Sequence, residues 1–304
     1  MCRVSCIIES LYIINVIMAN KIIIGIGEML WDMFPKWRIP GGAPANFAYH
    51  ASQFGFDGYI VSAVGNDSLG QEILKDFAEK GICVSVEVVD YYPTGTVEVE
   101  LDDKGMPQYE ICENVAWDYI PLTERMIDLA QNCSAVCFGT LAQRSEVSRK
   151  TTRRFLELVP ENAYKIFDMN LRQNFYSKDI MHESLKRCNI LKINDEEVAK
   201  AASLFGLGGM SEREVCLHFL KEYNLDIVVE TKGEIGSYVF AGDEVSYFDT
   251  PKVNVVDTVG AGDSFAGAFV GALLQGKSLR EAHKIAVDVS SYVCTRHGAM
   301  HCKI

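Results

Sequence analysis

The chain has 304 residues, 48% of them hydrophobic and 23% charged, and its 41 Asp and Glu against 29 Lys and Arg give a formal net charge of −12. This composition supports a sizeable core, and it excludes intrinsic disorder and a disulfide-stabilised miniprotein. Because an acidic surface repels polyphosphate backbones, we expect no nucleic-acid partner, although a local pocket can still bind a small anion.

The first twenty residues are atypical for the start of a folded domain. The apolar run there is interrupted by Glu9 and Asn15, is too short to span a bilayer and is not followed by a small-residue cleavage site. We expect residues 1–20 to be a non-native or disordered leader, with Met18 as the natural start and a signal peptide as the alternative. No later apolar segment has the length of a membrane helix, so no membrane partner is expected.

The ten cysteines are scattered and include no Cys-x-x-Cys pair. Several lie in apolar runs, as Cys137 does, where cysteine acts as a small buried hydrophobe. A long chain without a disulfide framework suits a reducing compartment, so we expect a cytoplasmic protein. The tail from Cys294 to Cys302 contains zinc-ligand residue types, but a zinc site is the less favoured interpretation.

From Lys21 onward, short β-branched runs alternate with longer amphipathic stretches. Strands are expected at 21–27, 59–64, 135–138, 164–168, 190–193 and 226–230, and helices at 45–54, 68–80, 145–158, 196–205, 212–223 and 264–275. This alternation implies right-handed crossovers and a mainly parallel sheet that is covered on both faces. The predicted fold is therefore a three-layer α/β/α sandwich.

Two segments break the alternation and predict a second, smaller sheet. Residues 94–101 place Val97, Val99 and Leu101 at period two, a turn follows, and residues 108–112 return as the second strand of a hairpin. Residues 29–34 are also expected to be extended. We interpret these segments as a discontinuous lid, from about 29–38 and 92–117, over the carboxyl ends of the parallel strands, where open α/β sheets bind ligands. A decorative hairpin is the alternative.

One phosphate-binding motif in the sequence is misleading. Residues 271–278 (GALLQGKS) match the P-loop pattern, but a P-loop must follow a strand and open a helix. Here the preceding residues are expected to be helical, Gly276 suits a helix C-terminus, and Ser278 with Glu281 forms a capping box. We interpret the match as a turn between two helices.

A stronger signal for anion binding lies upstream, in residues 257–265 (DTVGAGDSF). A β-rich approach at 253–256 leads into small residues that let a ligand come close, and the amides that open a helix offer an anion site. Asp263 falls at the start of that helix. It is either an N-cap or a carboxylate beside bound phosphate that serves as a base for a substrate hydroxyl, and the pattern favours the base.

A second glycine cluster, residues 41–46 (GGAPAN), precedes the first long helix, and Gly42 there allows tight approach of a ligand. Asp32 lies on the expected lid segment between apolar residues. An acidic side chain in that setting needs a partner, and a polyhydroxylated ligand offers one.

Together these motifs resemble those of the ribokinase (PfkB) family of carbohydrate kinases, over about residues 21–299. The resemblance rests on five ordered elements at family spacing: 41–46 followed by 51–55, 168–172 (DMNLR), 194–197 (NDEE), 231–236 (TKGEIG) and 257–265. It implies a ribokinase-like kinase domain over residues 21–304 that uses ATP with Mg²⁺. Lys232 departs from the smaller apolar residues common at its position.

The resemblance also implies a role for each matching residue. Asp263 is implied to be the base for the acceptor hydroxyl, with the amides of Gly260, Ala261 and Gly262 as the anion hole. The residues implied to bind the sugar are Asp32, Gly41, Gly42, Asn46 and Arg172. Those implied to bind the nucleotide are Asn194, Glu197, Thr231, Gly233, Gly236 and Ser237, of which Asn194 and Glu197 also contact Mg²⁺ through water. The implied K⁺ site consists of Asp257 with the carbonyls of Val259, Val293 and Gly298.

The predicted activity is ATP-dependent phosphorylation of a sugar hydroxyl. Residues 27–32, 138–144 and 170–172 most resemble the fructokinase branch, so D-fructose is the expected acceptor. Ribose, 2-keto-3-deoxygluconate or a nucleoside are alternative substrates, and a non-catalytic sugar- or nucleotide-binding regulator on the same fold is an alternative class. A homodimer through the stripe of Val97, Val99 and Leu101 is expected as in related dimers, unless that stripe only packs over the pocket.

Overall fold

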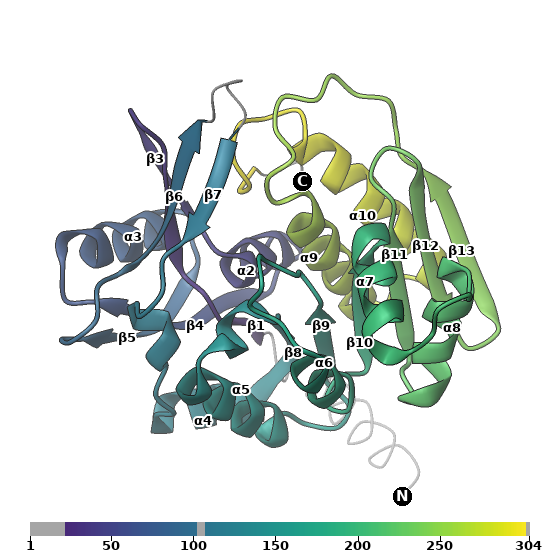
Figure 1. Cartoon of the computed structure of the whole chain (residues 1–304), viewed down its shortest axis with the longest axis horizontal. Helices are drawn as coiled ribbons and strands as arrows, with labels where there is room; N and C mark the ends of the chain where they lie inside the picture. Colours follow the sequence, from purple (N-terminus) through teal and green to yellow (C-terminus); the bar gives the residue numbers. More distant parts are fainter. Residues whose placement is uncertain (1–21, 102–106, 302–304) are drawn as a thin grey trace, which may run out of the picture.

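Two sheets organise the protein, for which the computed structural model describes residues 22–101 and 107–301 (Figure 1). The larger sheet has nine strands in the order β13-β12-β11-β10-β9-β8-β1-β4-β5. Its strands are β1 (Ile22–Ile26), β4 (Asp57–Gly65), β5 (Cys83–Val89), β8 (Cys133–Phe138), β9 (Tyr164–Asp168), β10 (Ile190–Asn194), β11 (Ile227–Thr231), β12 (Gly236–Ala241) and β13 (Glu244–Asp249). All pair in parallel except β12 and β13, so the predicted mainly parallel sheet is confirmed.

Helices cover both faces of the large sheet. One face carries α2 (Ala43–Ser52), α3 (Ser68–Glu79), α9 (Ala261–Leu274) and α10 (Leu279–Val293), and the other carries α4 (Glu124–Asn132), α5 (Glu146–Leu158), α6 (Lys178–Leu185), α7 (Asp195–Phe205) and α8 (Glu212–Glu222). In β1, Ile23 packs with α2 and α9, whereas Ile24 packs with the helices of the opposite face. Alternate residues of a strand buried on both sides explain its continuous β-branched run. The predicted three-layer arrangement is confirmed.

Glycines allow α2 to pack closely against both the sheet and α9. A Cβ added to Gly25 in β1 would lie 1.9 Å from the carbonyl oxygen of Pro44, near the start of α2. On α9, a Cβ at Gly267 would lie 2.7 Å from the Phe47 carbonyl oxygen, and one at Gly271 would lie 2.6 Å from the Phe54 ring. Because none of these positions has room for a methyl group, α2 is held at a fixed distance from β1 and α9.

The smaller sheet contains β2 (Leu30–Met33), β3 (Arg38–Gly41), β6 (Gly95–Leu101) and β7 (Pro107–Ile111), in the order β3-β2-β6-β7. The hairpin of β6 and β7 and the extended segment after β1 were both predicted, and β2 pairs in parallel with β6. Since β2 begins four residues after β1 ends, this sheet is attached at the carboxyl end of the large sheet. We refer to it below as the lid. Val97 is buried, and the side chains of Val99 and Leu101 lie outside the described residues, as do residues 1–21.

The structure differs from the sequence prediction at several places. The expected β-rich approach at 253–256 is wrong: these residues form no strand, and Val255 is 62% exposed. Strands β3, β5, β12 and β13 and helices α4 and α6 were not predicted, nor were the short 3₁₀ helices η1 (Ala116–Tyr119) and η2 (Leu141–Arg144). The turn that mimics a P-loop is confirmed, because α9 ends at Leu274, Gly276 has φ 79°, and Ser278 caps α10.

No helix in the described ranges has the length and apolarity needed to cross a bilayer. The seven cysteines in the same part of the chain are all free.

Candidate active site

The first turn of α9 and the start of α2 meet through a hydrogen bond between two predicted site residues. Asn46 Nδ2 donates to Asp263 Oδ2 at 2.8 Å, across 217 positions of sequence. The other side-chain atom of Asn46, Oδ1, is buried and has no hydrogen-bond partner among the described residues. The contact therefore orients the Asp263 carboxylate and leaves one buried acceptor for a ligand hydroxyl.

The surroundings of Asp263 increase its affinity for a proton. Burial raises the pKa of Asp263 to about 6, and the nearby Asp168 carboxylate adds to this, while the Asn46 hydrogen bond, Lys192 and Arg172 oppose it. The group is still largely ionised at pH 7, yet it is a stronger base than an exposed aspartate. Such a carboxylate is suited to take a proton from an attacking hydroxyl.

The three small residues before Asp263 form the beginning of α9. Gly260 is the N-cap, with φ 75° and no side-chain cap, and the amide of Ala261 donates to the Thr258 carbonyl at 3.2 Å. A Cβ on Gly260 would lie 2.3 Å from Cβ of Ala299, and one on Gly262 would lie 2.9 Å from Nζ of Lys192. The helix start is therefore enclosed by the C-terminal segment on one side and by an ammonium group on the other.

Lys192, which the sequence analysis did not single out, lies next to this helix start. Its ammonium group is bonded to both carboxylate oxygens of Asp168, at 2.9 and 3.0 Å, and both side chains are more than 90% buried. Burial lowers the pKa of Lys192, but the carboxylates of Asp168, Glu197 and Asp263 outweigh that effect and raise it. The site therefore holds a permanent positive charge beside Gly262. A lysine inside the apolar strand β10 was the available signal, since a buried charge needs a partner.

Three further charged residues surround the same site. Burial raises the pKa of Glu28 to about 7 and that of Asp32 to about 6, and in both cases the positive charge of Arg172 opposes the shift. Asp32 Oδ2 would lie 3.0 Å from a Cβ on Gly41, and the Glu28 carbonyl oxygen would lie 2.4 Å from one on Gly42. Of the residues predicted to bind sugar, Asn46 contacts Asp263 directly, and Arg172 is close enough to act on the carboxylates of both Asp32 and Asp263. Glu28, which is 3% exposed, was not predicted as a site residue.

Asn194 and Glu197 form the capping box of α7. Asn194 Oδ1 accepts from the Glu197 amide at 2.9 Å, and the Glu197 carboxylate accepts from the amides of Asn194 (2.9 Å) and Leu171 (2.8 Å). Both carboxylate oxygens of Glu197 therefore already have donors. This arrangement suits contact with a hydrated metal ion better than direct ligation.

The other residues predicted to bind nucleotide lie along β11, β12 and the turn between them. Thr231 ends β11, Gly233 has φ 51° in the turn, and Gly236 begins β12. The Ser237 hydroxyl is buried and contacts His283 Nε2 at 2.8 Å. Lys232 forms an ion pair with Glu212 on α8, so its side chain turns toward that helix.

Asp257 joins two of the segments predicted to form a potassium site. Its carboxylate accepts from the Val259 amide at 3.0 Å and from the Gly298 amide at 2.9 Å. Val293 is the last residue of α10, and its carbonyl accepts from the Arg296 amide at 3.0 Å. Carbonyl and carboxylate oxygens of this kind suit hard cations. Separately, the described ranges contain no cluster of three or more His, Cys, Asp or Glu that could hold a metal ion.

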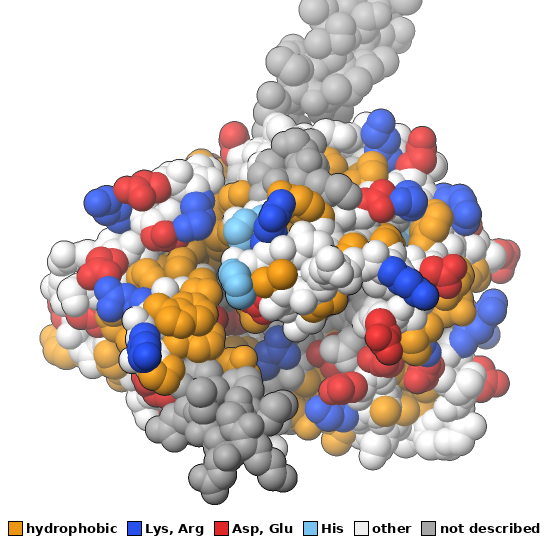
Figure 2. Space-filling model, turned by 90° about the horizontal axis from the view of Figure 1, so that it is seen from above, with side chains coloured by type: hydrophobic (Ala, Val, Ile, Leu, Met, Phe, Trp, Pro, Cys, Tyr) orange, Lys and Arg blue, Asp and Glu red, His pale blue; other side chains and the backbone are white. Residues whose placement is uncertain are grey.

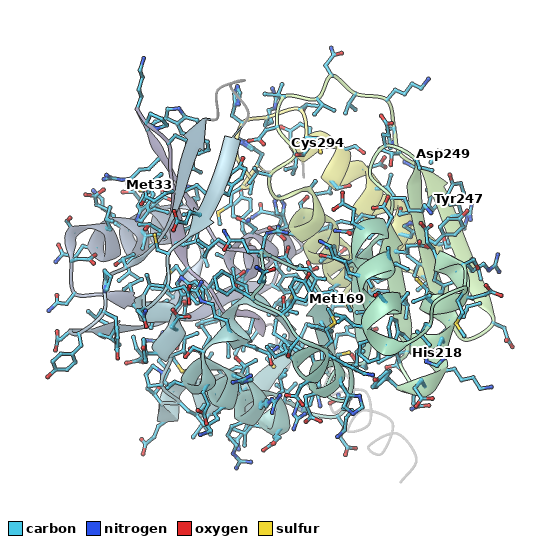
Figure 3. All side chains as sticks on the ribbon, in the orientation of Figure 1. Met33, Met169, His218, Tyr247, Asp249 and Cys294 are labelled. Carbon is cyan, nitrogen blue, oxygen red and sulfur yellow. The ribbon has the colours of Figure 1, made fainter. Side chains whose placement is uncertain are left out.

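Figure 3 places the surroundings of this site in the fold. Met169 marks the chain just beyond β9, near the middle of the molecule, Met33 lies on strand β2 of the lid, and Cys294 lies just past α10. The site is thus built from loops at one end of the large sheet, under the lid and beside the chain that follows α10.

A model of the pfkB family of carbohydrate kinases matches residues 35–304. The chain belongs to this family. It is 26% identical to a fructokinase from Salmonella typhimurium over 82% of this chain and 83% of the relative. The ribokinase-like fold, the membership of the pfkB family and the assignment as a phosphotransferase acting on a sugar hydroxyl are thereby confirmed.

The fold is also found in solved structures, among them two with bound nucleotide. A candidate ribokinase II from Escherichia coli, in complex with ATP and Mg²⁺, has a TM-score of 0.80 at 22% identity and covers 92% of this chain and 94% of its own. A double mutant of fructokinase from Vibrio cholerae, with fructose, ADP and potassium bound, has a TM-score of 0.78 at 21% identity and covers 93% and 94%. At this level of identity the likeness shows the fold.

Proposed function

We propose that this carbohydrate kinase transfers the γ-phosphoryl group of ATP to a hydroxyl group of D-fructose. The observation that carries the proposal is the Asp263 carboxylate, oriented by Asn46 at the start of α9. Asp263 takes the proton of the sugar hydroxyl while the oxygen of that hydroxyl bonds to the γ-phosphorus of ATP. The bond between the γ-phosphorus and the ADP leaving group breaks at the same time. Catalysis then depends chiefly on positioning and on stabilising the developing charge.

Each of the surrounding residues has a task in this proposal. The unpartnered Oδ1 of Asn46 accepts a hydrogen bond from a sugar hydroxyl, and Asp32, Gly41, Gly42 and Arg172 contact the rest of the sugar. The amides at 260–262 receive the transferring phosphoryl group. The Lys192 ammonium beside Gly262 adds positive charge where the phosphoryl charge develops.

Mg²⁺ is proposed to enter with ATP and to neutralise charge on the β- and γ-phosphates. Asn194 and Glu197 would hold its water ligands, because each carboxylate oxygen of Glu197 accepts one backbone amide and can accept a second hydrogen bond from a metal-bound water. Thr231, Gly233, Gly236 and Ser237 line the nucleotide. Asp257 with the carbonyls of Val259, Val293 and Gly298 would hold K⁺, and the Vibrio cholerae fructokinase structure with bound potassium supports this assignment.

A panel of acceptors in an ADP-release assay tests the substrate. With ATP and Mg²⁺, we expect kcat/KM for D-fructose to exceed that for ribose, 2-keto-3-deoxygluconate and inosine by at least about tenfold, since a site that pairs buried polar groups with one set of hydroxyls rejects others. A higher kcat/KM for another sugar would reassign the substrate within the family. Absence of sugar-dependent ADP release with every acceptor would favour a non-catalytic regulator.

We further propose that the protein is cytoplasmic and that it forms a homodimer. In this dimer the lids of the two copies face each other. Trp37, 52% exposed, directly precedes lid strand β3, and Phe34 stacks on Trp37 at a ring-centroid distance of 3.8 Å. These rings replace the predicted stripe as the contact, because Val97 of that stripe is buried in the core beneath the lid. Figure 2 shows hydrophobic side chains gathered on the left of the face seen from above. Light scattering coupled to size exclusion should give twice the chain mass, and a monomer at micromolar concentration would contradict the dimer.

A further inference from the structure

Helix α2 presents two side chains, one turn apart, to different parts of the phosphoryl-transfer site. Asn46 contacts Asp263, as described above, and His50 contacts the C-terminal segment. Residues four apart on a helix lie on the same face, so a single element orients both contacts. The proposed function assigns a task to Asn46 and none to His50.

The His50 contact is a buried hydrogen bond to the backbone. His50 is 2% exposed, and its Nε2 lies 2.7 Å from the carbonyl oxygen of Ala299. Burial lowers the pKa of His50 to about 4, the Ala299 hydrogen bond opposes the shift and His301 adds to it. The ring is therefore neutral at pH 7. Because a carbonyl can only accept, Nε2 carries the hydrogen and donates it.

Ala299 in turn packs directly on the first residue of the anion hole. A Cβ at Gly260 would lie 2.3 Å from Cβ of Ala299 and 2.8 Å from its Cα. Gly260, the N-cap of α9, is in the left-handed conformation and has no side chain that could cap the helix. The position of Ala299 therefore limits where Gly260 and the following amides can lie.

The same short segment also touches the lid. A Cβ at Gly298 would lie 3.8 Å from Ile39 on β3, and Met300 packs against the cluster that contains Met29 and Trp31. Residues 298–300 thus lie between the lid and the start of α9. The His50 hydrogen bond is what fastens the middle of this segment to α2.

We propose that His50 is a positioning residue for phosphoryl transfer: through the Ala299 carbonyl it holds residue 299 on Gly260 and so fixes the amides that open α9. The proposal rests on the proposed function, in that the phosphoryl group is received at 260–262. A buried histidine that only fills space would affect stability alone. A positioning histidine must affect kcat separately from the binding of either substrate.

Two substitutions separate the hydrogen bond from the volume of the ring. His50→Leu keeps an apolar side chain of similar size and removes the donor, and His50→Gln places an amide Nε2 where the ring nitrogen was. We expect His50→Leu to lower kcat about tenfold with KM for sugar and ATP within about twofold, since small displacements of catalytic groups are costly. His50→Gln should recover most of that loss. Equal kcat in wild type and His50→Leu, or equal losses in both variants, would overturn the proposal.

A double-mutant cycle tests whether His50 acts through residue 299. Ala299→Gly removes the methyl group that packs on Gly260 while it retains the carbonyl that His50 contacts. If His50 works by holding Ala299, the losses in kcat from His50→Leu and Ala299→Gly should be clearly less than multiplicative when combined. Multiplicative losses would show that the two residues act independently and would overturn the proposal.

Hydrogen exchange keeps the test independent of the proposed function. In His50→Leu, peptides covering 257–265 and 295–301 should exchange faster than in wild type, while peptides from β9 should exchange at the wild-type rate. In His50→Gln, all of these peptides should exchange as in wild type. If the wild type phosphorylates no sugar, the proposed function fails, and the exchange result still decides whether His50 fixes Gly260. Unchanged exchange at 257–265 in His50→Leu would overturn the proposal whatever the activity.

Discussion

Replacing Asp263 by Asn should lower kcat by about 10²–10⁴-fold and leave the affinity for ATP within about twofold, because the amide keeps the shape of the carboxylate but cannot accept a proton. The contact with Asn46 can persist through the remaining side-chain oxygen, so the fold and the sugar site are preserved. Sugar-dependent ADP release measures kcat, and calorimetry measures ATP binding in the same preparation.

The pH dependence of the wild type provides the second arm of this prediction. Burial raises the pKa of Asp263 from 3.8 to about 6, and the base must be deprotonated to act, so kcat/KM should fall as the pH drops below about 6. An exposed aspartate would retain activity to about pH 4. Near-normal turnover of Asp263→Asn, or a profile that is flat down to pH 4.5, would remove Asp263 from the mechanism.

Replacing Lys192 by Met should reduce both stability and turnover. Removal of the ammonium leaves the Asp168 carboxylate buried without its partner, and breaking a buried ion pair in this way costs about 3–5 kcal/mol. Turnover should fall at least about 10²-fold, because the positive charge beside Gly262 is lost as well. Urea denaturation measures the free energy of unfolding, and the ADP-release assay at a temperature where the variant is folded measures kcat.

The double variant Lys192→Met/Asp168→Asn separates the two effects. With both charges removed, no unpaired ion remains, so most of the lost stability should return. The turnover should stay low, because the positive charge is still missing. Wild-type turnover in the double variant would show that the Lys192 charge is not used. A single variant within 1 kcal/mol of wild type would contradict a buried ion pair at this position.

The fold could be predicted from sequence where burial imposes a pattern on the chain. Strand β9 was expected at 164–168 and is found there, since a strand covered on both faces is a short apolar run with clear ends. The hairpin of β12 and β13 was missed although Gly242 marks its turn, because only its first two residues were considered, as the end of the nucleotide-binding segment. At residues 253–256 a strand was predicted that the structure does not contain. The three valines there suit a strand, but no neighbouring strand pairs with them.

The site could be predicted where one local motif contains the functional residue. Asp263 and Asn46 lie in two glycine-rich segments, each recognisable by itself, and the structure joins them. Lys192 and His50 were missed for a common reason. Each acts through a partner that is distant in sequence, Asp168 at 24 positions and Ala299 at 249, and such pairing is created only by the fold.

The glycines at 25, 267 and 271 have a consequence for how this enzyme can change its specificity. Backbone atoms of α2 fill the space that side chains at 25 and 267 would need, and the Phe54 ring fills the space at 271. The distances from α2 to β1 and to α9 therefore cannot be changed by substituting these glycines. The pair of Asn46 and Asp263 is therefore held at a fixed position and can activate any hydroxyl group that a sugar places beside it. Divergence toward a different sugar is therefore expected in the lid strands and at Arg172, which can vary in sequence without moving the pair of Asn46 and Asp263.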